Sequence, residues 1–271
     1  MSAPGNDGAT RGSRGARLFV GSLAFLGIAL FALPLVGLFL RAPWSELASL
    51  LASSAVHDAL RLSLVSSFSA LALSVVLGLP IALWLASGSS ALRRAARLVV
   101  LLPIVLPPVV GGIALLLAYG RSGILGAPLE SWLGIALPFT TAGTVVAAAY
   151  LGLPFFVLSA EAGLRTLDRR YLELAATLGA GPARRFFTVT LPLVAPSLGA
   201  GGLLCWARSL GEFCATQTFA GNLEGTTRTM PLACGVAMER DPALAICLSL
   251  ILASISLLVL YVLHRRLELA R

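Results

Sequence analysis

Lysine is missing from this sequence: all 20 basic residues of the 271-residue chain are arginines. A P-loop nucleotide site needs a lysine that reaches the β- and γ-phosphates, so the chain cannot hydrolyse ATP by that route. The four cysteines and two histidines show no metal-ligand spacing, and we expect neither a metal site nor a cofactor. The H-E-x-x-H motif, the nucleophile elbow and a carboxylate cluster are also missing, which argues against an intramembrane enzyme with catalytic residues of its own.

Charge is scarce as well. Only 12% of the residues are charged, whereas 58% are hydrophobic and the mean hydropathy is +0.91. Such a chain cannot bury its apolar surface in one water-soluble core, so it needs a lipid bilayer as its solvent. Six apolar runs are long enough to cross a hydrocarbon core about 30 Å thick. They are residues 18–40, 60–86, 99–118, 139–160, 193–216 and 243–263. Because these runs are continuously apolar rather than alternating, we expect an all-α protein with six transmembrane helices.

The arginines predict how the chain is oriented in the membrane. With a cytoplasmic N-terminus, fourteen arginines fall in cytoplasmic segments, five fall outside, and Arg208 lies within a span. Cytoplasmic loops carry an excess of basic residues. We therefore expect a multi-pass protein of the cell (inner) membrane with both termini in the cytoplasm. The same asymmetry explains the net charge of +8 without a nucleic-acid partner.

The third predicted span, residues 99–118, contains Pro107 and Pro108. Proline removes a helical hydrogen bond and clashes with the preceding turn, so this helix is expected to be kinked or broken. Broken helices at membrane depth are tolerated where they are packed in protein or line a water-filled path. We interpret the two prolines as part of a transport pathway rather than as a packing kink.

The fifth predicted span, residues 193–216, carries Arg208 and Glu212 four residues apart on one helix face. At about 1.5 Å per residue, both fall in the outer half of the membrane. Two interpretations stay open: the pair packs the protein, or Arg208 helps an anion past a gate while Glu212 prevents the anion from being trapped. Thr216, at the end of the same span, is a further candidate for the pathway.

A short segment between two apolar runs, residues 171–192 with the sequence YLELAATLGAGPARRFFTVTLP, is too polar to span lipid. It resembles the signature loop of the membrane subunits of bacterial ABC importers, whose pattern is E-A-A, three residues, G, nine residues, I-x-L-P. The positions on this spacing are Glu173, Ala175, Gly179, Val189, Leu191 and Pro192. Leu174 replaces the first Ala of the pattern and Val189 replaces its Ile.

In that family the loop is a coupling helix that docks into a cleft of a cytoplasmic ATPase. The resemblance therefore implies a coupling helix near residues 168–182. The residues to which it gives this role are Glu173, Ala175, Ala176, Gly179 and Pro192. Small residues and a terminating glycine, either Gly179 or Gly181, fit a compact helix that a partner can approach closely.

Five further blocks resemble, in the same order, the permease of molybdate importers. They are LPIVLPPVVGG, GRSGILGAPLESWLGI, LGAGPARRFFTVTLP, ARSLGEFCAT and GNLEGTTRTMPLA, and the resemblance covers roughly residues 57–263. The GEF-x-AT element is shared with sulfate and tungstate permeases, whereas the following GTTRTMP favours molybdate. Cys214 stands where the family usually has glycine.

The resemblance implies the type I ABC importer permease fold, a homodimer, two cytoplasmic ATPase subunits and an external oxyanion-binding protein. Sulfate, thiosulfate or tungstate are alternative cargoes. An ion-coupled secondary carrier is a different class, but it would need acidic residues at mid-membrane and inverted repeats, and neither is evident.

The predicted organisation follows from these matches. Residues 57–263 form the permease core, and residues 18–56 add an N-terminal transmembrane helix and loop that shorter relatives lack. Residues 1–17 are expected to be a disordered cytoplasmic tail, and residues 264–271 a short cytoplasmic tail.

Overall fold

Helices account for all regular structure in residues 7–269, the part of the chain that the computed structural model describes. In chain order they are α1 (Asp7–Leu40), α2 (Leu47–Leu51), α3 (Ser54–Ala86), α4 (Ala91–Val105), α5 (Pro108–Tyr119), α6 (Gly126–Leu133), α7 (Thr141–Thr166), α8 (Arg169–Thr177), α9 (Pro182–Arg185), the π-helix η1 (Phe186–Thr190), α10 (Leu191–Leu210), α11 (Cys214–Phe219), α12 (Met230–Arg240) and α13 (Pro242–Leu269). The predicted all-α fold class is confirmed.

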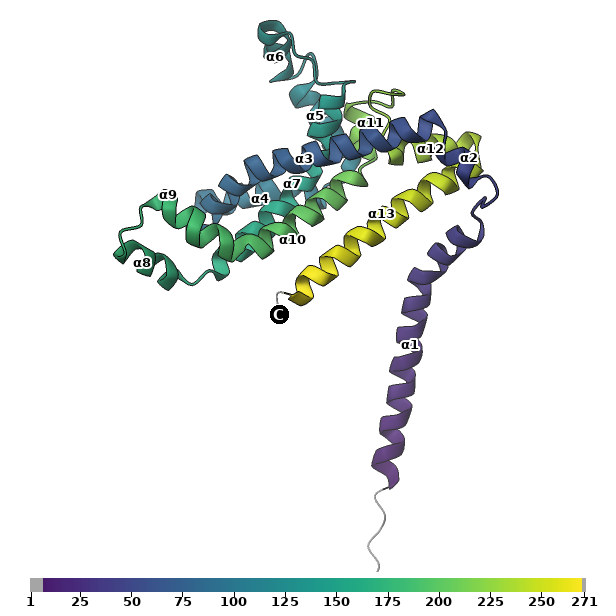
Figure 1. The fold of residues 1–271 in the computed structure, drawn as a ribbon, viewed down its shortest axis with the longest axis horizontal. Helices are drawn as coiled ribbons and strands as arrows, with labels where there is room; N and C mark the ends of the chain where they lie inside the picture. Colours follow the sequence, from purple (N-terminus) through teal and green to yellow (C-terminus); the bar gives the residue numbers. More distant parts are fainter. Residues whose placement is uncertain (1–6, 270–271) are drawn as a thin grey trace, which may run out of the picture.

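Helices α3, α7 and α10 pack against one another and form the centre of the molecule (Figure 1). Small residues allow the close approach of α7 and α10. A Cβ atom added at Gly152 of α7 would lie 2.4 Å from Ser209 Oγ in α10. One added at Gly201 of α10 would lie 2.7 Å from Ser159 Cβ in α7. Real Cβ atoms do not approach other atoms so closely, so both positions need glycine for helix packing, as is common between membrane helices.

Buried hydroxyl groups connect the central helices further. The indole Nε1 of Trp206 in α10 donates a hydrogen bond to Ser67 Oγ in α3 over 2.9 Å. Ser209 Oγ donates to the carbonyl oxygen of Ala148 in α7 over 3.1 Å. Interhelical hydrogen bonds of this kind satisfy polar groups that lipid would leave without partners.

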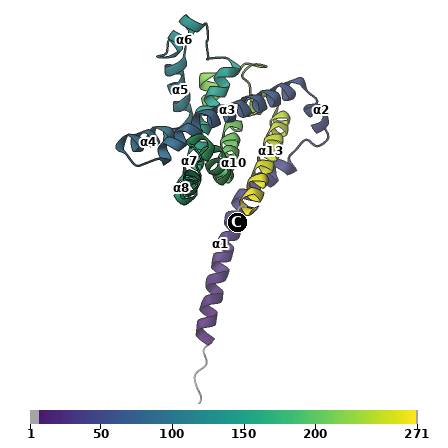
Figure 2. The same ribbon diagram turned by 60° about the vertical axis from the view of Figure 1, so that its left-hand side comes forward.

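The third predicted span, residues 99–118, is divided into two helices. Helix α4 ends at Val105 and α5 begins at Pro108, while Leu106 and Pro107 between them are extended, with ψ of 137° and 132°. The prolines therefore break the helix, as predicted, and α4 and α5 run in different directions (Figure 2).

The other five predicted spans correspond to helices that are long and apolar enough to cross a membrane. Within the described residues these are Phe19–Leu40, Ser54–Ala86, Thr141–Thr166, Pro182–Leu210 and Pro242–Val262. The predicted span 193–216 ends early, because α10 stops at Leu210 and α11 starts only at Cys214. Glu212 thus lies between two helices rather than on the face of one.

Helix α1 stands apart from the rest of the chain (Figures 1 and 2). No residue of its apolar segment Phe19–Leu40 is buried. The helix begins at Asp7, so most of the predicted tail 1–17 is helical, and residues 1–6 fall outside the described part. Helix α13 likewise continues to Leu269, beyond the predicted end of the last span at 263.

Candidate functional site

The segment that resembles a coupling helix forms α8, which lies at the end of the bundle far from α11 (Figure 1). It begins after Asp168, whose Oδ1 accepts a hydrogen bond from the backbone N–H of Arg170 over 2.9 Å. An aspartate in this position satisfies one of the free N–H groups of a helix start. The predicted range 168–182 therefore contains α8 and the turn that follows it.

Gly179 ends α8 with a left-handed backbone, at a φ of +79°. The N–H of Gly179 donates to the carbonyl oxygen of Ala176, and the N–H of Ala180 donates to that of Ala175, each over 3.0 Å. These two bonds form a Schellman motif, in which the left-handed residue is usually glycine. Steric crowding is not the reason for glycine at position 179, because a Cβ atom added there would have no neighbouring atom within 4 Å. The backbone conformation is what requires it.

Helix α8 presents an unusual surface for a helix outside the apolar core. Tyr171, Leu174 and Leu178 are 55%, 62% and 79% exposed, and their spacing of three and four residues places them on one face. Glu173 is exposed as well. An apolar stripe open to solvent is the kind of surface that a protein partner covers.

Not all the coupling candidates lie together. Glu173, Ala175 and Ala176 lie in α8 and Gly179 caps it, whereas Pro192 is exposed at the start of α10, after α9 and η1. Helix α8 also packs against η1 and α9, so the whole segment from Arg169 to the first turn of α10 forms one projecting unit.

The family follows from residues 78–268, which match the model described as binding-protein-dependent transport system inner membrane component. The chain belongs to this family. The molybdenum transport system permease protein ModB of Mycobacterium tuberculosis is 45% identical over 236 residues, which cover 87% of this chain and 89% of that protein. ModB of Escherichia coli is 45% identical over 163 residues, covering 58% and 71% of the two chains. ModB of Haemophilus influenzae is 39% identical and covers 78% and 94%.

Solved structures show the same fold. A bacterial ABC transporter involved in the import of the acidic polysaccharide alginate has a TM-score of 0.72 at 18% identity, and the match covers 96% of this chain and 98% of that one. An inward-facing methionine ABC transporter, MetNI, has a TM-score of 0.55 at 16% identity, with coverage of 88% and 98%. This inner membrane component therefore has the type I ABC importer permease fold that was expected.

Arg208 and Glu212, the charged pair of the candidate pathway, contact each other directly. Arg208 Nη1 donates to Glu212 Oε2 over 2.7 Å. The second carboxylate oxygen, Oε1, accepts the backbone N–H of Ala215 over 2.7 Å, in the first turn of α11. Arg208 also lies in the last turn of α10, where a cation is favoured by the helix dipole. Glu212 therefore joins the end of one helix to the start of the next.

The remaining pathway candidates differ in their surroundings. Pro107 is exposed and Pro108 starts α5, which packs against α11. The contact is close, because a Cβ added at Gly112 of α5 would lie 2.7 Å from Thr218 Cβ. Thr216 is buried inside the protomer. Among the described residues, no three His, Cys, Asp or Glu side chains gather in a way that could hold a metal ion.

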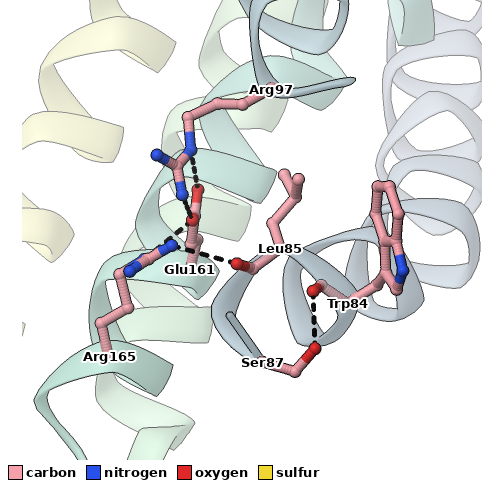
Figure 3. A network of polar contacts seen from close by, with 6 residues as sticks. All are labelled: Trp84, Leu85, Ser87, Arg97, Glu161 and Arg165. Carbon is pink, nitrogen blue, oxygen red and sulfur yellow. Dashed lines mark hydrogen bonds and ion pairs between the residues drawn. The ribbon is translucent and has the colours of Figure 1, made fainter. Parts of the chain in front are cut away.

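Sequence reasoning missed one polar cluster, in which Glu161 of α7 binds Arg97 of α4 and Arg165 of its own helix (Figure 3). Arg97 and Arg165 are two of the fourteen arginines that the sequence assigns to cytoplasmic segments. A signal was present, since Glu161 directly follows a predicted span, 139–160, and an acid at a membrane boundary needs a partner. The identity of that partner could not be read from the sequence.

Proposed function

We propose that this chain is the membrane permease subunit of an ATP-driven importer that carries molybdate into the cell. The family assignment and the relatives named as molybdenum transport permeases support the cargo, and the helices long enough to span a membrane support the location. ATP hydrolysis belongs to a separate subunit, because a chain without lysine cannot form a P-loop.

The observation that carries this proposal is the exposed face of α8. A helix that projects from the membrane bundle with Tyr171, Leu174 and Leu178 uncovered has the form of a docking element. We propose that it inserts into a groove of a cytoplasmic ATPase. The arginines near it, Arg184 and Arg185 among them, support a cytoplasmic position for α8 by the positive-inside rule.

The remaining partners follow from this assignment. We propose that two copies of the chain pair about a two-fold axis, with the pathway between them, and that two ATPase subunits hold the two α8 helices. An oxyanion-binding protein docks on the opposite, external side, near residues 119–138 and 217–242. ATP binding then draws the α8 helices together and opens the pathway outward, and hydrolysis resets it.

Uptake of radiolabelled molybdate tests the cargo. Cells that lack this chain are compared with the same cells after its return, with sulfate, thiosulfate and tungstate as competitors. We expect uptake to depend on the chain and to persist in excess sulfate. If sulfate abolishes it, the importer is one for sulfate. If uptake continues without the chain, the proposal fails.

The docking role is tested with Gly179→Leu and, as a matched control, Gly181→Leu. Gly181 is also exposed and has open space around it, but its φ is an ordinary −65°. A left-handed conformation costs a non-glycine residue about 1–2 kcal/mol, so Gly179→Leu disturbs the end of α8. We expect loss of molybdate uptake and of ATPase co-purification for Gly179→Leu alone. Equal behaviour of the two variants would contradict the docking role.

A further inference from the structure

The carboxylate of Glu161 is buried and is held by two arginines (Figure 3). Arg97 Nε donates to Glu161 Oε2 over 3.1 Å, while Arg97 Nη2 binds Oε1. Arg165 Nε also donates to Oε1, over 2.9 Å. The contact with Arg97 is bidentate, which fixes the relative orientation of the two side chains as well as their distance. It joins α4 to α7 across 64 residues of sequence.

A third helix belongs to the same cluster. Arg165 Nη2 donates to the backbone carbonyl oxygen of Leu85 over 3.0 Å (Figure 3). Leu85 lies in the last turn of α3, where backbone carbonyls lack partners within the helix. The arginine satisfies one of them, so Glu161, Arg97 and Arg165 bind the end of α3, the middle of α4 and the end of α7 together.

The cluster lies between two parts of the chain that could move during transport, α8 and the break between α4 and α5. Arg165 lies three residues before Asp168, the N-cap of α8. Arg97 lies eight residues before Val105, the last residue of α4, and thus about 12 Å from the break at Leu106 and Pro107 at about 1.5 Å per residue. Glu161 is thus separated from α8 by the last turn and a half of α7 and the two extended residues Leu167 and Asp168, and it is connected to the break through α4.

Few side chains of α4 are buried within the single chain. All its residues are described, and Pro103 is the only one that is buried. Leu98, Val99 and Val105 are more than two thirds exposed. Within one copy of the chain, Ala96 and Val100 of α4 are partly buried against the core, and the two hydrogen bonds from Arg97 add a polar contact that orients α4 relative to α7.

We propose that Arg97, Glu161 and Arg165 transmit the movement of α8 to the broken helix α4–α5, and that Arg97 is the positioning residue of this connection. The inference rests on the proposed docking of α8 to an ATPase. According to this inference, a cluster that lies outside the pathway makes the opening of the pathway depend on ATP. The break at Leu106 and Pro107 supplies the joint at which α4 can change its angle to α5.

The test is the number of molybdate ions imported per ATP hydrolysed, measured in proteoliposomes with the complete transporter. This ratio does not depend on how much complex is folded, so a merely structural defect leaves it unchanged. Arg97→Ala removes the link while Arg165 still neutralises Glu161. Arg94→Ala, an exposed arginine on the same helix, is the matched control.

We expect Arg97→Ala to lower the ratio at least about fivefold, the lower end of the usual coupling between two sites, with ATP hydrolysis retained. Arg94→Ala should keep the wild-type ratio. Arg97→Lys keeps the positive charge but cannot form the bidentate contact of a guanidinium, so it should give an intermediate value. A wild-type ratio for Arg97→Ala would overturn the inference, as would an equal fall for Arg94→Ala.

If Arg97→Ala does not assemble, Arg97→Lys decides: a ratio below wild type supports the connection, and an unchanged ratio overturns it. Failure of the proposed function is seen separately in the wild-type complex. If that complex hydrolyses ATP without importing molybdate, the function is wrong and the inference falls with it. If wild type transports normally and only the Arg97 variants give the contrary result, the inference alone is wrong.

Discussion

Neutralising Glu212 should destabilise the protein mainly through its contact with Arg208. The structure allows the two roles of the carboxylate to be separated. Glu212→Gln keeps an oxygen that can accept the N–H of Ala215 but loses the charge that binds Arg208. Glu212→Ala loses both contacts. Arg208→Gln removes the other charge, and the double variant Arg208→Gln with Glu212→Gln completes a double-mutant cycle.

The expected magnitude follows from the burial of the two groups. The Glu212 side chain is 3% exposed and that of Arg208 is 29% exposed, so water weakens the pair only in part. A hydrogen bond to a charged group contributes about 1.5–3 kcal/mol to stability. Measured couplings between membrane helices are smaller, about 0.6 kcal/mol on average and about 1.7 at most. We therefore expect about 1.5 kcal/mol for the pair, with about 1 kcal/mol more lost in Glu212→Ala, as for an N-cap.

Equilibrium unfolding of the purified protein by SDS in mixed micelles measures these free energies, and molybdate uptake is measured with the same variants. A coupling near 1.5 kcal/mol, with uptake reduced only as far as assembly is, identifies the pair as structural. A coupling below about 0.5 kcal/mol, together with loss of uptake in Arg208→Gln, would refute this reasoning and assign Arg208 to the movement of the anion. Equal stability of Glu212→Gln and Glu212→Ala would refute the role of Glu212 in starting α11.

Three further predictions follow. Glu173→Lys should abolish molybdate uptake but not membrane insertion, because it reverses the charge of an exposed side chain of α8; normal uptake would argue against a contact at Glu173. In a background without native cysteines, a cysteine at Glu224 should react with an impermeant thiol reagent in intact cells and one at Arg184 should not, and labelling at 184 would overturn the orientation. Gly112→Ala should lower the free energy of unfolding by about 1–3 kcal/mol through overpacking against Thr218. Gly199→Ala is the control, because there is open space around Gly199, and it should leave the free energy of unfolding unchanged. Equal SDS unfolding curves for the two variants would contradict the close α5–α11 contact.

Local chemistry explains which features could be predicted from the sequence. The break between α4 and α5 was predicted from two consecutive prolines, Pro107 and Pro108. A single proline does not have this effect in the neighbouring helices, since Pro103 lies inside α4 and Pro154 inside α7. The end of α8 at a glycine was predicted as well, but the sequence offered both Gly179 and Gly181, and the structure gives the left-handed conformation to Gly179. The exposure of Tyr171, Leu174 and Leu178 could not be predicted, because it depends on how far α8 projects from the bundle.

Features that depend on contacts across the chain escaped prediction. The end of α10 at Leu210 was missed although Gly211 and Glu212 interrupt the apolar run there. The restart at Cys214 involves a hydrogen bond from the N–H of Ala215 to Glu212, and the sequence alone does not indicate that bond. The Glu161 cluster was missed for a similar reason. Arg97 is 64 residues away, and no spacing rule pairs residues at such a distance.

The tight contacts at Gly152 and Gly201 have a consequence for how the subunit moves. With no room for even one added carbon at these crossings, α7 and α10 cannot slide along each other without backbone collision. Together with α3 they should behave as one rigid body throughout the transport cycle. Any alternation between inward and outward states is then expected to be a rotation of this block as a unit, with deformation confined to the loosely packed α4 and α1.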